Sequence, residues 1–449
     1  MKKTTHSGTN DHPDLRDQRK EIRKALKIHR QNQDKKGEAQ DWSLLGTIEV
    51  KRGRYEKARK NYQKSLKIWE QIGDEMGQVN VQYALATTDM KQGNHDRARK
   101  TFNEVLERYE KMGAFHEVGT TLYSLALIDA YEEKYDSARG SFHRAQDIFQ
   151  KTGDKASEVS TLYNLASINL RMGDPDAAYE SYQNALKLMQ GVGDRFGVAR
   201  TLQNLAEMDL VQGRPADALD KLQNNLDFWQ EVGDEVEEGN TLGRMGLIWL
   251  RQEDMQSAQE AFQRSLEIWQ RIDDEPGEST AWHNLAAVAL GQREFESALE
   301  KYQNALDIEQ RIGDEKGEAT TWHNMASIDL DQEEFEKGAD KLRKSLAIHQ
   351  RIGEKAGESI NLFQLGLAAA KMGRVKEGLQ LVALSVSIVG TGKDSVNSEI
   401  RPAIDALISE AGYTEEQFDA LCQEVAKAYQ RDRGQGLIEA AFKDRNYSV

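Results

Sequence analysis

Apolar residues recur along this chain at the spacing of amphipathic helices. Between residues 42 and 72, Trp42, Leu45 and Ile48 share one face of a first predicted helix, and Gly53 ends that helix. The apolar stripe of a second predicted helix follows, at Tyr55, Ala58, Tyr62, Ser65, Leu66, Ile68 and Ile72. The pattern therefore predicts two helices joined by a short turn.

The same unit returns every 40 residues without an insertion, and a two-residue signal marks each junction. Its first position holds Gly73, Gly113, Gly153, Gly193, Gly233, Asp273, Gly313 and Gly353. Its second position holds Asp74, Ala114, Asp154, Asp194, Asp234, Asp274, Asp314 and Glu354. A glycine can adopt the left-handed conformation that ends one helix, and an aspartate can cap the N–H groups that begin the next. We therefore expect a tight turn at each junction.

Two further columns of the repeat differ in side-chain size. A small residue stands at Ala58 and every 40 residues onward, and the last two copies are Gly338 and Gly378. Four positions later the residues are Tyr62, Phe102, Phe142, Tyr182, Leu222, Phe262, Tyr302, Leu342 and Val382. Small and large residues in register allow paired helices to interlock with about 8–10 Å between their axes.

The pattern resembles the tetratricopeptide repeat, whose signature it matches at Trp42, Leu45, Gly46, Ala58, Tyr62 and Ser65. The usual repeat has about 34 residues. A longer second helix and links such as IGDEKGE extend it here, as in the spindle-orientation adaptors with Leu-Gly-Asn repeats and in many bacterial arrays. One column departs from the signature, because polar residues replace the expected tyrosine at Asp129, Asn169, Asp209 and Asp329. Nothing in the sequence explains that substitution.

The resemblance implies an all-α fold, a right-handed superhelical solenoid of antiparallel helix pairs with helical caps. We predict a disordered tail at residues 1–14 and a solenoid at residues 15–390, with a half-repeat helix at 15–31 followed by about nine pairs. Residues 391–449 leave the period. They are predicted to form a linker and helices at 397–410, 414–431 and 435–443 that cover an open end of the array.

The resemblance also implies that the first helix of each pair lines a concave face, on which two neighbouring columns are notable. One column is rich in rings, at Tyr83, Tyr123, Tyr163, His283, His323 and Phe363. The next position carries an amide at Asn164, Asn204, Asn284 and Asn324. An amide can bond both polar groups of a peptide unit, with about 1 kcal/mol net per bond, and long-repeat relatives grip ligand peptides through this asparagine. Both columns are therefore candidates for binding a partner.

Other interpretations of these residues stay open. The asparagines can instead bond neighbouring helices, and the rings can pack between repeats. Arg200, Arg244 and Arg251 lie on or near the same predicted face and would suit an acidic residue of a partner. Ordinary surface ion pairs explain these arginines equally well.

Charge and composition narrow the class of partner. The net charge of −15 disfavours nonspecific nucleic-acid binding. Residues 1–60 hold 17 Lys and Arg against 9 Asp and Glu, which indicates either a solvated end cap or a docking patch for an acidic partner. The longest apolar stretch, LVALSVSIVG, is far short of the ~20 residues that span a membrane. A single cysteine and a polar N-terminus predict a cytoplasmic protein.

His283 and His323 are the candidate metal-binding or catalytic residues, because they hold the same place in TAWHNLA and TTWHNMA. Zinc needs three or four ligands, and neither column supplies a carboxylate or thiol, so we predict no metal and no catalytic pair. VGTGKDS at 389–395 departs from a phosphate-binding loop, since Ser387 and Asp394 stand where glycine and Ser/Thr are required. Cys422 is predicted to be an inert thiol on a helix. No cofactor is expected.

Together these features predict a non-enzymatic adaptor that binds an extended or helical segment of another protein in its concave groove. The alternative is a regulatory sensor in a signalling or defence complex, whose solenoid changes shape when a peptide or partner binds. Self-association through the ends of the array stays open as well.

Overall fold

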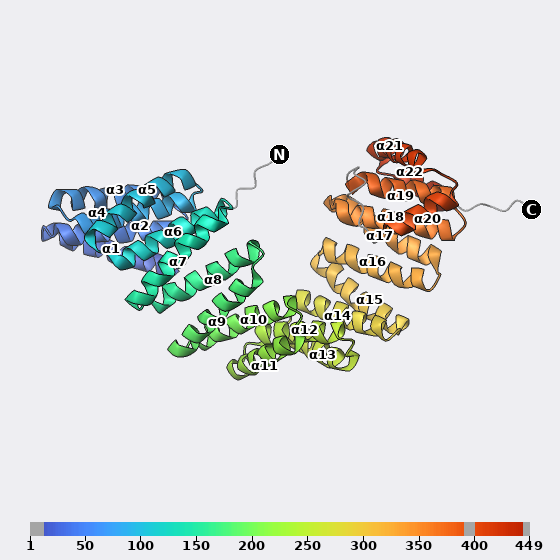
Figure 1. Ribbon diagram of the computed structural model, residues 1–449, viewed down its shortest axis with the longest axis horizontal. Coiled ribbons are helices and arrows are strands. Elements are labelled where there is room, and N and C mark those ends of the chain that lie inside the picture. Colours follow the sequence, from blue (N-terminus) through green and yellow to red (C-terminus); the bar gives the residue numbers. More distant parts are fainter. Residues whose placement is uncertain (1–12, 390–399, 443–449) are drawn as a thin grey trace, which may run out of the picture. The chain divides into compact units, whose positions relative to one another are not determined.

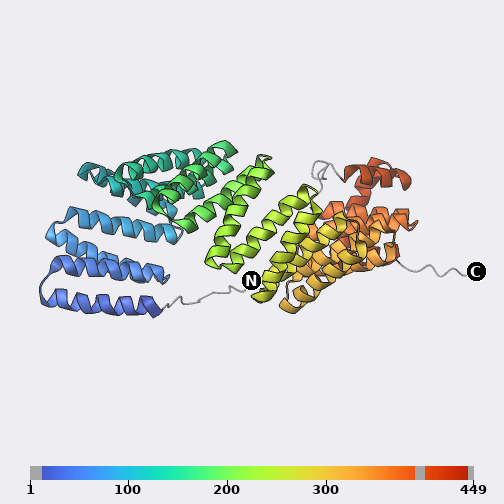
Figure 2. The ribbon, with the colours of Figure 1, turned by 90° about the horizontal axis from the view of Figure 1, so that it is seen from below.

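A computed structural model describes residues 13–389 and 400–442, and these residues form 22 α-helices and no strand (Figure 1). The chain divides into two compact units, residues 1–221 and 222–449, and the division falls inside helix α11. Within each unit, consecutive helices lie side by side in antiparallel pairs (Figure 2). The expected all-α repeat fold is confirmed.

The first unit opens with a single helix, α1 (Pro13–Gln31), which packs on the first helix pair. The first helices of the following pairs are α2 (Lys35–Lys51), α4 (Glu75–Lys91), α6 (Phe115–Tyr131), α8 (Lys155–Arg171) and α10 (Arg195–Val211). The second helices are α3 (Tyr55–Ile72), α5 (His95–Met112), α7 (Tyr135–Thr152), α9 (Pro175–Val192) and α11 (Pro215–Val232).

The second unit continues the same alternation. Its first helices are α12 (Glu235–Arg251), α14 (Glu275–Gly291), α16 (Glu315–Asp331) and α18 (Lys355–Lys371). Its second helices are α13 (Met255–Arg271), α15 (Phe295–Ile312), α17 (Phe335–Ile352) and α19 (Val375–Val389). The array thus contains nine pairs between Lys35 and Val389, as the period predicts.

The junction signal acts as expected. Gly73 ends α3 in the left-handed region, with φ of 71°, and Asp74 accepts a hydrogen bond of 2.8 Å from the backbone N–H of Gly77. Asp273 holds the same left-handed conformation without being glycine, with φ of 55°. Ala114 and Glu354 make no capping bond through their side chains. Each tight turn brings the second helix of one pair directly onto the first helix of the next.

The small column lets the two helices of a pair approach closely. Ala58 is fully buried, and the ring of Tyr62 fills the space beside it with 3% of its surface exposed. A methyl group added at Gly46 would lie 2.6 Å from that ring, and one added at Gly246 would lie 2.5 Å from the ring of Phe262. The glycine and the aromatic ring are therefore complementary across each of these pairs.

The polar column that departs from the family signature ties helices together. Asp129 on α6 is 4% exposed and accepts hydrogen bonds from Arg99 of α5 at 2.5 Å and from Ser137 of α7 at 2.7 Å. Asp209 of α10 bonds Arg214 and Lys221 at 2.6 and 2.5 Å. A buried carboxylate is tolerated when it is paired and hydrogen-bonded. At Asp129 and Asp209 the column therefore replaces tyrosine packing with ion pairs.

The C-terminal helices cover the end of the second unit. They are α20 (Arg401–Glu410), α21 (Glu415–Asp432) and α22 (Gln435–Phe442), close to the predicted ranges, and they pack against α19. Tyr429 donates to Glu358 at 2.5 Å, and Arg374 donates to the carbonyl of Ala441 at 2.6 Å. Cys422 is buried in this cap, and burial raises the pKa of its thiol to about 11, which fits the inert thiol predicted.

Some predictions fall on residues that the structure does not describe. The disordered tail predicted at residues 1–14 lies outside the described residues apart from the start of α1. The linker predicted from residue 391 and the first three residues of the helix predicted at 397–410 also lie outside them. The rejected phosphate-loop motif at 389–395 also lies almost wholly outside them.

Candidate functional site on the first helices

The ring column of the first unit forms a hydrogen-bonded ladder between neighbouring first helices. The Tyr83 hydroxyl of α4 lies 2.9 Å from Ser124 Oγ of α6, and the Tyr163 hydroxyl of α8 lies 2.5 Å from Thr201 Oγ1 of α10. Burial raises the pKa of Tyr83 and Tyr123, so both phenols stay neutral at physiological pH. These tyrosines are half-buried, so each ring serves the seam between repeats while part of it reaches the surface.

The two histidines continue this arrangement and do not converge. His283 Nε2 of α14 lies 2.8 Å from Thr321 Oγ1 of α16 and 2.9 Å from Glu309 Oε1 of α15. His323 Nδ1 of α16 lies 2.8 Å from Asn361 Oδ1 of α18. Each imidazole therefore bonds the next first helix, as the tyrosines do. Among the described residues, no group of three or more His, Cys, Asp or Glu side chains could hold a metal ion.

Glu309 is a residue that the reasoning from sequence missed. Its carboxylate is 2% exposed and accepts hydrogen bonds from Ser279 at 2.9 Å and from Thr321 at 2.6 Å, in addition to its contact with His283. In the six preceding pairs the equivalent position is apolar or aromatic, at Trp69, Tyr109, Phe149, Met189, Trp229 and Trp269. A charged residue in an otherwise apolar or aromatic column is the feature of the sequence that could have identified Glu309.

The four asparagines differ in whether their side-chain amides already make hydrogen bonds within the array. Asn164 Nδ2 donates to the Tyr123 hydroxyl at 2.9 Å and to the Ser160 carbonyl at 2.8 Å, so both of its amide hydrogens are used within the array. The side chains of Asn204, Asn284 and Asn324 are half-buried and make no hydrogen bond to any other described residue. Their amides can each offer both a donor and an acceptor to a ligand.

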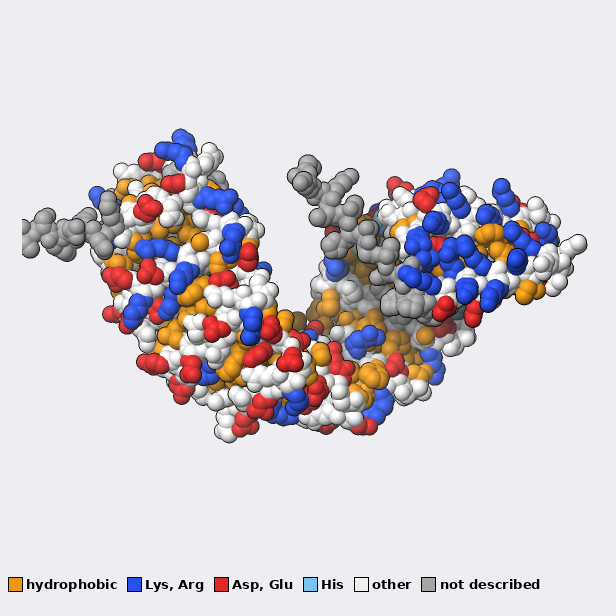
Figure 3. All heavy atoms as spheres, turned by 180° about the vertical axis from the view of Figure 1, so that it is seen from behind, with side chains coloured by type: hydrophobic (Ala, Val, Ile, Leu, Met, Phe, Trp, Pro, Cys, Tyr) orange, Lys and Arg blue, Asp and Glu red, His pale blue; other side chains and the backbone are white. Residues whose placement is uncertain are grey.

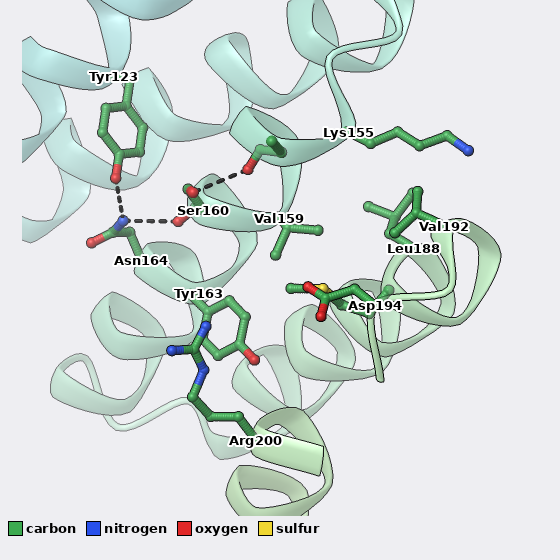
Figure 4. A pocket seen from close by; sticks show the side chains of 12 residues that line it. Tyr123, Lys155, Val159, Ser160, Tyr163, Asn164, Leu188, Val192, Asp194 and Arg200 are labelled. Carbon is green, nitrogen blue, oxygen red and sulfur yellow. Dashed lines mark hydrogen bonds between the residues drawn. The ribbon is translucent and has the colours of Figure 1, made fainter. Parts of the chain in front are cut away.

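A hollow in the first unit brings four of the candidate residues together. Tyr123, Tyr163, Asn164 and Arg200 line a cavity of about 660 Å³ among α6, α8, α9 and α10 (Figure 4). The remaining lining residues are Lys155, Ala156, Val159, Ser160, Leu188, Met189, Val192 and Asp194. Cavities of ~300–1,000 Å³ are the usual size of small-ligand sites. The hollow therefore offers an aliphatic wall, an amide and a cation on one surface.

A second hollow of about 660 Å³ lies three repeats earlier, between α2, α3 and α4. It uses equivalent positions of the repeat, since Gln40, Ser43, Leu44, Trp69, Asp74 and Asn80 correspond to Ser160, Tyr163, Asn164, Met189, Asp194 and Arg200. The repeat thus places a hollow beside the first helix as part of its geometry, and the side chains give each hollow its chemistry.

The other candidate binding residues do not line this hollow. Arg244 and Arg251 are exposed on α12 of the second unit, whereas Arg200 lies on α10 of the first. Phe363 of α18 is half-buried and packs against the large core that includes the C-terminal helices. Lys and Arg side chains gather at the N-terminal end of the first unit (Figure 3), where α1 is rich in exposed basic residues.

The sequence itself matches the model of the tetratricopeptide repeat at residues 38–111, 117–190, 157–231 and 237–311, which together cover more than half of the chain. The chain therefore belongs to the tetratricopeptide repeat family, as the resemblance indicated. No curated protein gives a significant match to it.

Three solved structures are similar to this chain. The apo form of RapI is 15% identical, with 79% of this chain and 99% of that chain aligned at a TM-score of 0.52. BtubC from P. vanneervenii is 20% identical over 49% of this chain and 92% of its own, with a TM-score of 0.45. The apo form of the quorum sensor NprR from B. thuringiensis is 15% identical over 79% and 99%, with a TM-score of 0.46. At these identities the likeness concerns the fold alone.

Among the described residues, no helix is both long enough and apolar enough to cross a membrane.

Proposed function

We propose that the protein is a non-catalytic scaffold whose first helices hold an extended segment of another protein. The observation that carries this proposal is the pair of half-buried amides on neighbouring first helices of the second unit, Asn284 of α14 and Asn324 of α16, and the equivalent amide of the first unit, Asn204; none of them has a partner among the described residues. A peptide backbone that hydrogen-bonds these amides gains about 1 kcal/mol net per bond. Affinity therefore depends on several such bonds and on apolar contact with the surrounding first helices.

Surface charge supports recognition through hydrogen bonds and apolar contact. Despite the net charge of −15, the first-helix column at Gln40 and every 40 residues onward is almost uncharged, and it is exposed except at the half-buried Thr120. Its further members are Asn80, Thr120, Ser160, Arg200, Asn240, Thr280, Thr320 and Ile360. A neutral surface lined with amides and hydroxyls fits a peptide backbone, which carries one donor and one acceptor per residue. Arg200 is the exception in this column.

The test compares the native partners of three forms of the full chain. One form is wild type, and the second has Asn204, Asn284 and Asn324 replaced by alanine. The third is a matched control with alanine at three polar residues of second helices, Asn103, Gln183 and Asn304. Asn164 is left intact, because its replacement would also break the bond to Tyr123.

Each form is used to capture proteins from native lysate, and the captured proteins are quantified by mass spectrometry. We expect at least one protein to be enriched by wild type and control and to be lost from the first-helix variant. Circular dichroism must show that all three forms have the same helix content. If both variants capture the same proteins as wild type, these amides do not bind the partner.

A further inference from the structure

The outer face of the second helices changes the sign of its charge along the chain. At steps of 40 residues, one outer position holds Lys20, Lys60, Lys100, Gly140, Glu180, Asp220, Glu260, Glu300, Asp340 and Gln380. The position seven residues later holds Lys27, Lys67, Glu107, Asp147, Lys187, Asp227, Glu267, Asp307, Ala347 and Ser387. Helix α1 fits this series because it occupies the place of a second helix. Both positions are therefore cationic at the start of the array and mostly acidic further on.

Two consecutive helices of this series, α1 and α3, carry lysine at both positions, at the end of the first unit where basic side chains gather (Figure 3). These four side chains are exposed and form what we call the lysine face: Lys20, Lys27, Lys60 and Lys67. None of them makes an ion pair with another described residue. Cations that point into the array are paired instead, as Arg19 of α1 is with the buried Glu49 at 2.8 Å. The lysine face therefore keeps its positive charge at the surface.

The acidic counterpart lies on two consecutive second helices of the second unit, α13 and α15. Its four side chains are also exposed and form what we call the carboxylate face: Glu260, Glu267, Glu300 and Asp307. Three of them accept hydrogen bonds from neutral glutamines of their own helix, as Asp307 does from Gln303 at 2.7 Å. None of the four is paired with a cation among the described residues. This face therefore keeps its negative charge at the surface.

The two faces match in geometry because they use the same positions of the same repeat. On each helix the two charges are seven residues apart, which is about 10 Å along the helix axis. In each face the two helices are one repeat apart. Neighbouring acidic helices match less well, since Asp220 of α11 and Asp340 of α17 already interact within the array and Ala347 replaces the second acid of α17. Surfaces of opposite charge steer proteins together and fix their register.

We propose that the lysine face of one copy docks on the carboxylate face of a second copy of this chain. The contact is heterologous, because two different surfaces meet, and it leaves one face free on each copy for the addition of further copies. Exposed ion pairs are individually weak, so the association depends on protein concentration and on salt. It uses the outer side of second helices and is independent of the first-helix amides of the proposed function.

The test compares wild type with three variants of the full chain. The first reverses the lysine face: Lys20→Glu, Lys27→Glu, Lys60→Glu and Lys67→Glu. The second reverses the carboxylate face: Glu260→Lys, Glu267→Lys, Glu300→Lys and Asp307→Lys. The third has the same net charge as the first but changes exposed cations outside the lysine face: Lys91→Glu, Lys111→Glu, Lys151→Glu and Arg171→Glu. Circular dichroism must show the same helix content for all four forms.

Sedimentation velocity gives the average mass over about a hundredfold range of protein concentration, because a contact of exposed ion pairs is weak. In about 0.1 M salt, where the Debye length is about 10 Å, the masses of wild type and the third variant should rise with concentration. In about 1 M salt, both should return to the monomer mass. The two face-reversed variants should each stay monomeric, because both of their faces have the same sign. An equimolar mixture of these two variants should associate again.

Cross-linking locates the contact. Unlabelled and isotopically labelled wild type are mixed and treated with a carbodiimide, which joins lysines directly to carboxylates. We expect cross-links between labelled and unlabelled copies that join the two faces, such as Lys60 to Glu260, and their loss in high salt.

Three outcomes would overturn the proposal. The first is wild type that stays monomeric at every concentration, even if another acidic protein or a nucleic acid binds the lysine face. The second is association that persists in both face-reversed variants. The third is cross-links between copies that avoid the two faces. None of these outcomes bears on peptide binding by the first helices, which capture from lysate tests separately.

Discussion

The seams between first helices share one geometry in the two units but use different chemistry. In the first unit, the rings of Tyr83 and Tyr123 pack on Phe102 and Phe142 with centroids 5.3 and 5.5 Å apart, and their hydroxyls bond the next first helix. In the second unit, His283 packs on Tyr302 at 5.3 Å and makes the equivalent bond through its imidazole. The repeat fixes where the bond forms, and the residue decides whether a phenol hydroxyl or an imidazole makes it.

The buried residues of the second helices that lie against these seams also differ in chemistry between the two units. Phe149 of α7 is 1% exposed, and its ring occupies the space that a methyl group on Gly119 would enter at 2.9 Å. The equivalent residues of α15 and α17 are Glu309 and His349, with 2% and 6% of their surfaces exposed. Apolar burial stabilises the first unit here, whereas polar side chains occupy the same place in α15 and α17 of the second. Removing the buried ring should destabilise the protein by leaving a cavity, whereas removing the buried polar group should do so by leaving its hydrogen-bond partners unsatisfied.

The largest effect is expected from Phe149→Ala. It deletes a fully buried ring and leaves a cavity between α6, α7 and α8, so the free energy of unfolding should fall by about 3–5 kcal/mol. Urea unfolding followed by circular dichroism measures the loss, and hydrogen exchange should locate it in α6–α8. Phe115→Ala is the control, because that ring is 67% exposed. Equal effects of the two substitutions would contradict the role given to Phe149.

The second effect concerns Glu309→Ala. The substitution leaves the hydroxyls of Ser279 and Thr321 without their buried acceptor, which costs about 1–3 kcal/mol for each group that stays unsatisfied. We expect the free energy of unfolding to fall by about 2–4 kcal/mol, with faster exchange in α14–α16. Glu300→Ala on the exposed face of α15 is the control. A loss no greater than that of the control would show that water replaces the carboxylate.

The sequence predicted the helices and their caps because these depend on local signals. Gly73 and Asp74 specify the turn by conformation and capping, and the period carries that turn to every repeat. The C-terminal helices fell within a few residues of their predicted ranges, since Thr414 and Gln417 form a capping box that opens α21. Residues that act on their own backbone could therefore be placed without a structure.

Pairings between distant residues could not be predicted in this way. Asp129 finds Arg99 at a separation of 30 residues, while Asp209 finds Lys221 at a separation of 12, so one column uses two different partners. The same limit applied to the asparagines. All four share a column, but only Asn164 faces a tyrosine hydroxyl at the right distance. Which candidate amides remain free for a ligand depended on these contacts.

His349 makes the stability of the second unit depend on pH. Burial lowers its pKa, His323 and Lys316 act in the same direction, and Glu354 opposes them. The folded state therefore favours the neutral imidazole, whose contribution to stability is complete above the ordinary pKa of about 6.5. It is lost as the pH falls through the lowered pKa of the folded protein. The slope for one proton cannot exceed about 1.4 kcal/mol per pH unit.

The free energies of unfolding of wild type and His349→Phe are compared between pH 8 and pH 5, and their difference gives the pH-dependent contribution of the imidazole. Phenylalanine suits the site, because the ring of residue 349 covers Gly357 much as Trp269 covers Gly277. We expect the second unit of wild type to lose stability with acid more steeply than that of the variant. Parallel pH profiles would show that the imidazole is not the titrating group.

The smallest effect is expected from Tyr123→Phe, which removes one hydroxyl from the ladder and keeps the ring against Phe142. The free energy of unfolding should fall by about 1 kcal/mol, the usual net value of one hydrogen bond. Tyr131→Phe, at a ring that is 71% exposed, is the control. Combining Tyr123→Phe with Asn164→Ala should add little to either change alone, because both remove the same bond. Additive losses would mean that Asn164 stabilises the array without Tyr123.

Because Tyr123→Phe also frees one N–H of Asn164, the variant should bind peptides at least as well as wild type. Weaker binding would place the hydroxyl itself against the ligand.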